Sequence, residues 1–346
     1  MTSARIPVTL LTGFLGAGKT TLLNRILTGD HGRRYAVIVN EFGEVGIDVD
    51  LVLSSDEELF EMNNGCVCCT VRGDLIRTLY SLLERSEQFD AIIIETTGLA
   101  DPGPVAQTFF VDATLQDRLA LDSITTVVDA RHIQDTLKQS AEAEEQIAFA
   151  DQMVLNKVSL VSPQTLESVE RSLRAINRFA PIYKADRADI PLDKILGKGS
   201  FDLDRITQLE SGFLNPGHGE PGHVHDEQCE NRGHDHNHHD HTHDASVTSL
   251  VVESDQPMDA QRLSDWLNEY LAENGQDILR AKGIVDAAGE DRRLVFQAVH
   301  MMVEGDFQRP WKPDEVRKSQ LVFIGRNLNR DELQAGLMAC AQNHLS

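Results

Sequence analysis

The chain lacks the features that would assign it to a membrane or to a nucleic acid. Its 346 residues contain no apolar run near the roughly 20 residues that a helix needs to cross a bilayer. Basic residues are scarce beside acidic ones, because 32 Lys and Arg stand against 55 Asp and Glu and give a formal charge of −23. Such a surface repels phosphate backbones and anionic lipids. We therefore expect neither nucleic acid nor membrane among the partners.

Cysteine is also scarce, and it is unevenly placed. The chain has five cysteines, too few to form a disulfide framework in a protein of this size. Only one basic residue, Arg5, precedes an apolar run that stops at Gly13, which argues against a secretory signal. We expect a cytoplasmic protein.

What the chain does contain is a phosphate-binding sequence. Gly13 to Thr20 reads Gly-Phe-Leu-Gly-Ala-Gly-Lys-Thr and fits the spacing G-x-x-x-x-G-K-[ST] without a mismatch. Glycines let successive N–H groups face one anion, the lysine supplies a point charge, and the hydroxyl of Thr20 can bind Mg²⁺. An apolar run precedes this loop and helical periodicity follows it, as the motif requires. We expect the nucleotide to contact Gly13, Gly16, Ala17, Gly18, Lys19, Thr20 and Thr21.

Alternating apolar runs and helical periodicities predict an α/β domain. Short apolar strands are expected at 6–12, 35–39, 59–62, 91–94, 125–129, 152–156 and 181–184, with helices at 75–84 and 163–179 among those between them. Strands alternating with helices of these lengths are typical of a mostly parallel sheet covered on both faces. The first domain is thus predicted to be a P-loop NTPase domain.

The length favours two domains, and the composition places the linker between them. We divide the chain into a P-loop domain at 1–211, a flexible linker at 212–246 and a smaller C-terminal α+β domain at 247–346. Nine of the 13 histidines lie in the linker, where a mobile imidazole tract would capture transition metals with little selectivity. In the last domain, strands are expected at 250–252, 294–299 and 321–324, with a helix over 263–271 and another starting near Asn329.

Two further positions complete a nucleotide site. Glu95 ends an apolar strand, and its carboxylate can reach Mg²⁺ or a water bound to it, while the N–H of Gly98 can approach the γ-phosphate. We expect Lys19 and Glu95 to be the catalytic residues.

Asn156-Lys157-Val158-Ser159 follows a later strand, at the place expected for a guanine-reading Asn-Lys-x-Asp sequence. An aspartate there would accept hydrogen bonds from both N1–H and N2–H₂ of guanine, and a serine cannot reproduce that pair. Binding of the nucleotide by Asn156 and Lys157 is expected, with a weakened preference for guanine.

The cysteines Cys66, Cys68 and Cys69 lie in a turn at the front of a helix. Three thiolates within four positions can converge on one soft or borderline metal ion, with a fourth ligand from elsewhere in the chain. Redox-active cysteines or buried packing cysteines are the alternatives. We expect Glu44 to join the three cysteines at the metal, and we regard His132 as a structural residue more readily than as a further ligand.

With these residues in view, the sequence resembles the CobW-type GTPases, a family of zinc metallochaperones among the P-loop GTPases. The resemblance covers nearly the whole chain and is carried by these segments: 12–21, Asn40-Glu41-Phe42-Gly43-Glu44, Gly65-Cys66-Val67-Cys68-Cys69, Glu95-Thr96-Thr97-Gly98, Asp101-Pro102 and 307–311. It implies GTP hydrolysis with Mg²⁺, release of GDP, a C-x-C-C metal site and a histidine-rich linker. Ser159 departs from the aspartate that is usual in the family.

The resulting hypothesis is a GTPase that holds a transition metal, Zn²⁺ before Co²⁺, and transfers it to a client metalloprotein. In this hypothesis the loop 40–50 acts as a switch between the two sites. Cobalt delivery for cobalamin synthesis or nitrile hydratase activation is the alternative of the same class. A metal-buffering protein and a small-molecule kinase are alternatives of other classes. Self-association is compatible with the sequence.

Overall fold

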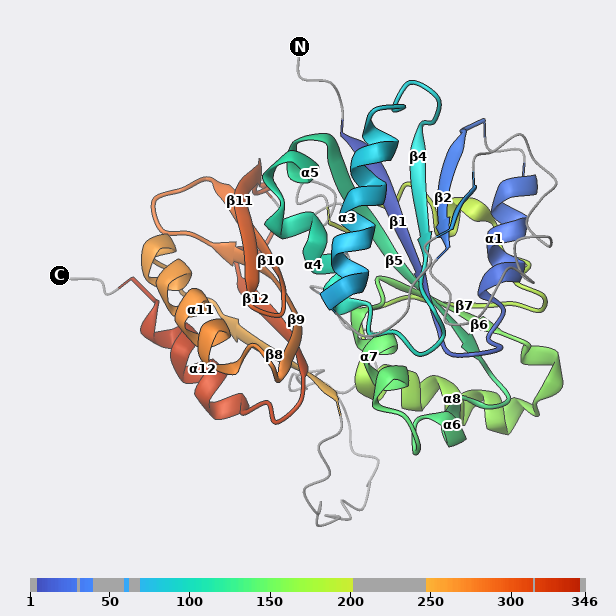
Figure 1. Cartoon of the computed structure of the whole chain (residues 1–346). Coiled ribbons are helices and arrows are strands. Elements are labelled where there is room, and N and C mark those ends of the chain that lie inside the picture. Colours follow the sequence, from blue (N-terminus) through green and yellow to red (C-terminus); the bar gives the residue numbers. More distant parts are fainter. Residues whose placement is uncertain are drawn as a thin grey trace.

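The computed structural model describes residues 5–29, 32–39, 59–61, 69–201, 247–313 and 315–342, with the backbone alone at 59–61 and 69–72. These residues form two domains that lie against each other (Figure 1). No helix in these ranges combines the length and the apolar character needed to span a membrane.

Seven parallel strands form the sheet of the N-terminal domain. Their spatial order is β3 (Leu59–Glu61), β2 (Tyr35–Val39), β4 (Ala91–Glu95), β1 (Ile6–Thr12), β5 (Leu119–Asp129), β6 (Gln152–Asn156) and β7 (Ile182–Lys184). Because all the strands run in one direction, the residues that follow them meet along one edge of the sheet. Ligands of open α/β sheets bind outside that edge.

Apolar side chains alternate between the two faces of this sheet. In β4, Ile92 and Ile94 join one core cluster while Ala91 and Ile93 join the other. One face is covered by α1 (Lys19–Thr28) and the segment 185–196. The opposite face is covered by α3 (Cys69–Leu83), α4 (Gly103–Val111), α5 (Ala113–Arg118), α6 (Ile133–Thr136), α7 (Ala141–Phe149) and α8 (Pro163–Ile176). The prediction of a parallel sheet covered on both faces is confirmed.

Several element boundaries differ from the prediction, and α8 and β5 show two physical reasons. Helix α8 ends at Ile176 and does not reach 179, because the buried Asn177 side chain takes over the hydrogen bonds of the next turn. Its Oδ1 accepts from the N–H groups of Phe179 and Ala180, and its Nδ2 donates to the carbonyl of Ile147 at 2.9 Å. Strand β5 begins at Leu119, six positions earlier than expected, and its residues from Leu119 to Thr126 pair with β1.

The C-terminal domain is an antiparallel sheet with two helices on one face. The strand order is β11 (Met302–Pro310), β10 (Arg292–Val299), β9 (Ile278–Asp286), β12 (Ser319–Gly325) and β8 (Thr248–Ser254). Helices α11 (Ala260–Asn274) and α12 (Arg330–Ala339) begin after Asp259 and Asn329, whose side chains accept hydrogen bonds from the first N–H groups of each helix. The prediction of a small α+β domain is confirmed, although the sequence left β9 and β11 unassigned.

The other face of the C-terminal sheet packs on the N-terminal domain. Leu279, Ile284, Val295 and Val299 belong to the same buried cluster as Phe149 at the end of α7. In Figure 1, α11 and α12 cover the outer side of this sheet, and the N-terminal domain lies against its inner side. The two domains therefore share a hydrophobic core.

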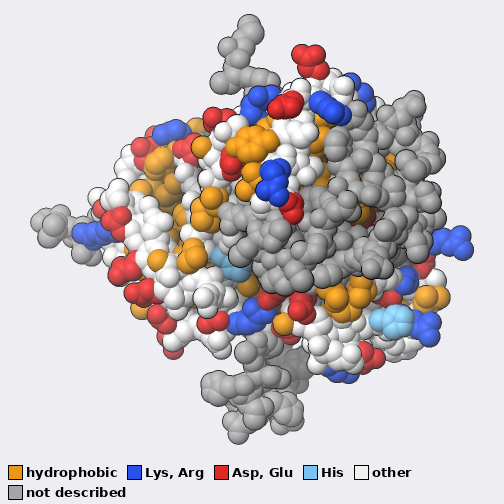
Figure 2. Space-filling model, viewed as in Figure 1, with side chains coloured by type: hydrophobic (Ala, Val, Ile, Leu, Met, Phe, Trp, Pro, Cys, Tyr) orange, Lys and Arg blue, Asp and Glu red, His pale blue; other side chains and the backbone are white. Residues whose placement is uncertain are grey.

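Basic and acidic side chains alternate over the face shown in Figure 2. The described Lys and Arg side chains there are interspersed with Asp and Glu and do not gather into one patch. The described part of this face therefore offers no continuous basic track for a polyanion.

A buried charge network joins the two domains. Asp151, which is 1% exposed, forms ion pairs with Arg280 and Lys282 of β9, and the Lys282 Nζ lies 3.0 Å from Asp151 Oδ1. Arg280 also donates to the carbonyl oxygen of Phe149 at 2.5 Å and lies over the ring of Phe201. Burial alone would raise the pKa of Asp151, but the two cations and the Ile124 N–H outweigh it and lower that pKa.

We predict that Asp151→Ala lowers the free energy of unfolding by about 3–5 kcal/mol, because it leaves two cations buried without a counter-charge. Since the pKa of Asp151 is lowered in the folded state, its contribution is complete above the ordinary carboxyl pKa, about 4, and is lost as the pH falls further. Denaturant unfolding at pH 7 and below pH 4 measures both effects.

The control is Asp135→Ala, which removes the exposed ion pair with Lys138 and should cost at most about 1 kcal/mol. Equal losses for the two variants would contradict a structural role for the buried network.

Candidate functional site

The loop between β1 and α1 has the conformation of a phosphate cradle. Gly13, Gly16 and Gly18 have φ values of +139°, +74° and +109°, which side chains rarely allow. A Cβ on Gly13 would lie 2.2 Å from the carbonyl oxygen of Val127, so the loop packs directly on the backbone of β5. Helix α1 then begins at Lys19 with its first N–H groups and positive end toward the loop.

Lys19 folds back across this loop. Its Nζ donates to the carbonyl oxygen of Gly13 at 2.8 Å and approaches that of Phe14 at 3.5 Å, and the residue is 9% exposed. The ammonium group is thus held within the ring of the loop, where a bound phosphate chain would lie. It adds a full positive charge to the backbone dipoles of the cradle.

Thr20 and Glu95 meet next to the cradle. The Thr20 hydroxyl donates to Glu95 Oε1 at 3.3 Å, and Glu95 is 6% exposed at the end of β4. A hydroxyl and a carboxylate that lie side by side are hard oxygen ligands, and they suit Mg²⁺ either directly or through a water molecule. The residues therefore fit the ion that a nucleotide brings with it.

Gly98 lies against the phosphate loop at Leu15. A Cβ at this position would lie 2.6 Å from the backbone nitrogen of Leu15, so only glycine permits this approach. Its carbonyl oxygen and that of Ala100 both accept from the buried amide of Gln146 in α7, at 3.2 and 3.0 Å. The turn after β4 is therefore fastened both to the phosphate loop and to α7.

Asn156 and Lys157, at the end of β6, contact the phosphate loop. Asn156 Nδ2 donates to the carbonyl oxygen of Ala17 at 2.9 Å, and Lys157 Nζ donates to that of Gly16 at 2.7 Å. Lys157 has φ +62°, a left-handed conformation that turns the chain sharply after β6. These two residues are brought to the cradle as the motif predicts.

Asp129 is a residue that the sequence reasoning missed. Its Oδ2 lies 2.7 Å from Lys157 Nζ and 3.0 Å from His132 Nδ1. Burial would raise its pKa, but the hydrogen bonds from His132 and Lys157 outweigh burial and lower the pKa of Asp129. The carboxylate holds Lys157 in place beside the phosphate loop. Its position at the end of strand β5 is the sequence signal that could have marked Asp129 as a site residue. His132 contacts Asp129 through Nδ1, and its structural role stays a prediction.

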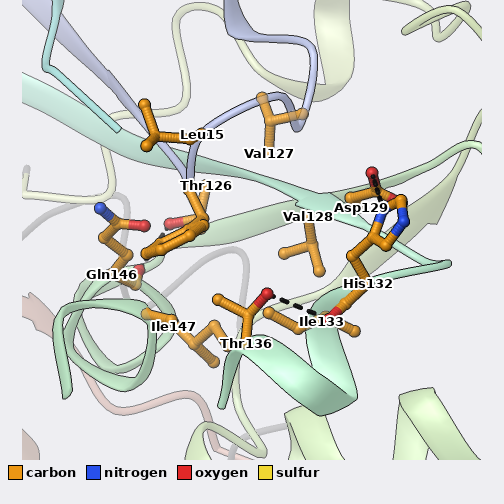
Figure 3. Close-up of a pocket in the computed structure, with 12 residues that line it drawn as sticks. Leu15, Thr126, Val127, Val128, Asp129, His132, Ile133, Thr136, Gln146 and Ile147 are labelled. Carbon is orange, nitrogen blue, oxygen red and sulfur yellow. Dashed lines mark hydrogen bonds and ion pairs between the residues drawn. The ribbon is translucent and has the colours of Figure 1, made fainter. Parts of the chain in front are cut away.

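A cavity of about 20 Å³ lies beneath the phosphate loop (Figure 3). Figure 3 shows Leu15 above it, Thr136 and Ile147 below it, and His132 turned toward Asp129. The volume suits about one water molecule. It cannot hold a nucleotide, which has to bind on the outer side of the loop.

Comparison with known proteins identifies the family. Residues 7–184 match the CobW/HypB/UreG nucleotide-binding domain, and residues 247–341 match the cobalamin synthesis protein cobW C-terminal domain. The chain belongs to this family.

Full-length relatives of the CobW family agree with that assignment. The zinc chaperone YjiA of Escherichia coli is 36% identical over 95% of this chain and 97% of that protein. The zinc-regulated GTPase metalloprotein activator 1 of Schizosaccharomyces pombe is 33% identical over 94% of this chain and 83% of that protein. The crystal structure of Zn(II)-bound YjiA GTPase from E. coli matches with a TM-score of 0.72 at 32% identity, over 98% of this chain and 100% of that one.

The expected metal ligands fall largely outside the described residues. Glu44, Cys66 and Cys68 lie in the ranges that are not described, together with the loop 40–50 and the histidine tract. Cys69 begins α3, but its side chain is not described either. Among the side chains that are described, no three His, Cys, Asp or Glu residues are grouped as a metal site requires.

We predict that Glu95→Gln lowers nucleoside triphosphate hydrolysis roughly 10- to 100-fold, because the neutral amide keeps the shape beside Thr20 but weakens the hold on the metal or its water. Phosphate release measured over a range of Mg²⁺ concentrations should show the loss and a higher Mg²⁺ requirement.

Glu167→Gln is the matched control, because Glu167 is exposed on α8. Hydrolysis by Glu95→Gln equal to that of the control at every Mg²⁺ concentration would remove Glu95 from the site.

Proposed function

We propose that this protein is a cytoplasmic GTPase that binds zinc at Cys66, Cys68 and Cys69 and transfers it to a client metalloprotein. The proposal is carried by one observation. The phosphate loop, Glu95 and the pair Asn156-Lys157 meet at one edge of the sheet, in a chain of which 95% matches a zinc chaperone. A reducing compartment suits the proposal because it keeps thiolates free to bind metal.

Each group of residues has a place in this function. Lys19 and the N–H groups of the loop bind the β- and γ-phosphates, Thr20 and Glu95 hold Mg²⁺, and Gly98 faces the γ-phosphate. The Mg²⁺ ion, when bound, neutralises charge on the phosphates during transfer to water. Glu95, held beside Thr20, can also orient that water.

Zinc is the cargo in this proposal, and thiolates are suitable carriers. Cysteine sulfur binds Zn²⁺ in the deprotonated state, so loading releases protons and weakens at low pH. Helix α3 begins at Cys69 and packs on the sheet through Leu75, Leu79 and Leu82. A change at the nucleotide that moves α3 would therefore reach the cysteines directly.

The described residues also supply a route from the nucleotide to the C-terminal domain. Five positions after Gly98, Gly103 begins α4, and a Cβ there would lie 2.6 Å from Nε2 of His300 in the β10–β11 turn. The ring of His300 packs on Phe149, 5.4 Å between centroids. The helix that follows the turn expected to face the γ-phosphate thus lies against the C-terminal domain at His300.

The decisive test of the proposal is anaerobic titration of Zn²⁺ into the GTP-bound and GDP-bound forms. We predict that the two zinc affinities differ by about 1–3 kcal/mol and that replacing Cys66, Cys68 and Cys69 by alanine abolishes this high-affinity site. The site should also release protons on loading.

Cys340→Ala is the matched control. Cys340 is buried, its thiol donates to the carbonyl oxygen of Gly336, and burial raises its pKa, so we expect its loss to leave zinc binding unchanged. Unchanged zinc stoichiometry in the triple variant, or equal affinities in the two nucleotide states, would reject the chaperone function.

A second prediction concerns the link between the sites. Gln146→Leu removes both hydrogen bonds to the turn after β4, and we expect it to reduce the GTP-to-GDP difference in zinc affinity toward zero. Affinity for GTP itself should change only a few fold, because the hydrogen bonds that Gln146 loses go to the turn after β4 and not to the phosphate loop. Calorimetric titration measures both quantities.

Gln134→Leu is the control, since its amide makes a comparable hydrogen bond to Ser168 between α6 and α8. A full nucleotide-dependent difference in Gln146→Leu would show that the signal does not pass through this amide.

A further inference from the structure

The guanine-reading part of the site poses a chemical problem. Asn156 and Lys157 occupy their expected places, but Ser159 stands where a carboxylate would read the base. Guanine presents two donors on one edge, N1–H and N2–H₂, and a carboxylate with two oxygens accepts both. A hydroxyl provides one oxygen and no charge, so Ser159 alone cannot account for a preference for guanine.

A carboxylate is nevertheless present at this place, and it comes from another loop. Asp186, in the loop that follows β7, accepts at Oδ1 from both the backbone N–H and the hydroxyl of Ser159, at 3.0 and 2.8 Å. Both residues are exposed, and both bonds from Ser159 go to the same oxygen, Oδ1. Ser159 thus orients the carboxylate of Asp186.

The position of Asp186 is fixed with respect to the phosphate loop. Asn156 Oδ1 accepts from the N–H of Ala188 at 2.9 Å, while Nδ2 of the same amide donates to Ala17 in the phosphate loop. Arg187 and Ala188 have φ values of +51° and +54°, so the chain turns tightly just after Asp186. The two base-side loops and the phosphate loop are therefore joined through one amide.

We propose that Asp186, positioned by Ser159, is the residue that selects guanine in this protein. The proposal rests on the GTPase function proposed above and names the source of its base specificity. Ionised Asp186 accepts from N1–H and N2–H₂ of guanine, and these are hydrogen bonds to a charged group. Adenine offers an acceptor at N1 and no amine at C2, so the same carboxylate repels it.

The sharpest test exchanges the carboxylate for an amide. Xanthine differs from guanine by a carbonyl at C2, so Asp186→Asn can donate its NH₂ to that carbonyl while its oxygen accepts from N1–H. We expect Asp186→Asn to bind GDP roughly 10- to 100-fold more weakly than the parent protein and to gain affinity for XDP. Calorimetric titration of the full chain with GDP, XDP and ADP measures the change.

Asp189→Asn is the matched control. It removes the same charge three positions further along the same loop, where Asp189 forms an exposed ion pair with Arg25. It should leave the ranking of GDP, XDP and ADP unchanged. Thermal unfolding of each variant separates a change of specificity from a loss of folding.

Two further variants first remove the carboxylate and then restore it on the neighbouring loop. Asp186→Ser should lose the preference for GDP over ADP, and the double variant Ser159→Asp with Asp186→Ser should recover it, because the carboxylate then stands on the neighbouring loop. If Asp186→Asn keeps the parent's affinities for GDP and XDP, or if the double variant binds no better than Asp186→Ser, Asp186 does not read the base. If the parent protein binds none of the three nucleotides, the GTPase function itself fails.

Discussion

The side-chain amide of Asn156 is the contact on which the nucleotide site depends. It donates to Ala17 in the phosphate loop and accepts from Ala188 after β7, so it joins loops that are 139 and 32 residues away in the chain. Asn156 is 2% exposed, and a Cβ on Gly18 would lie 2.5 Å from its Nδ2. Glycine at position 18 is therefore required both by its backbone conformation and by the space that this amide occupies. The phosphate loop and the loop after β7 are thus held together by one side-chain amide.

The second constraint is that the nucleotide domain shares its core with the C-terminal domain. Helix α7 contributes to both arrangements, since Gln146 fastens the turn after Gly98 while Phe149, at the end of the helix, contacts Arg280 and His300. A rigid element that touches two sites can transmit a shift from one to the other when both sites favour different positions of it. Charged groups stabilise this contact, because Asp151 loses its compensation if β9 moves away.

The sequence predicted those parts of the fold and site that are local in the chain. The phosphate loop, the parallel strands and Glu95 follow from periodicity and spacing over a few residues. Strand β9 escaped notice because Arg280 and Lys282 alternate with apolar residues, as they would on a solvated face, yet here they face Asp151. Strand β11 has no fully buried residue, and the polar residues at its centre break its apolar pattern. Asp129 and Asp186 were missed for another reason: their roles depend on partners 28 and 27 residues away, which only the register of the sheet brings near.

Ser159 shows how a motif and the site that it describes can diverge. The usual motif places the carboxylate on the loop after β6. Hydrogen bonding to guanine depends on where the carboxylate lies and not on which loop carries it. Strands β6 and β7 are parallel neighbours, so their following loops emerge side by side, and the Asn156 amide ties the second loop to the first. A serine on one loop and an aspartate on the other can then place a carboxylate at the same edge as the reverse arrangement would. The departure at position 159 removes a carboxylate from the motif without removing it from the base-binding edge of the sheet.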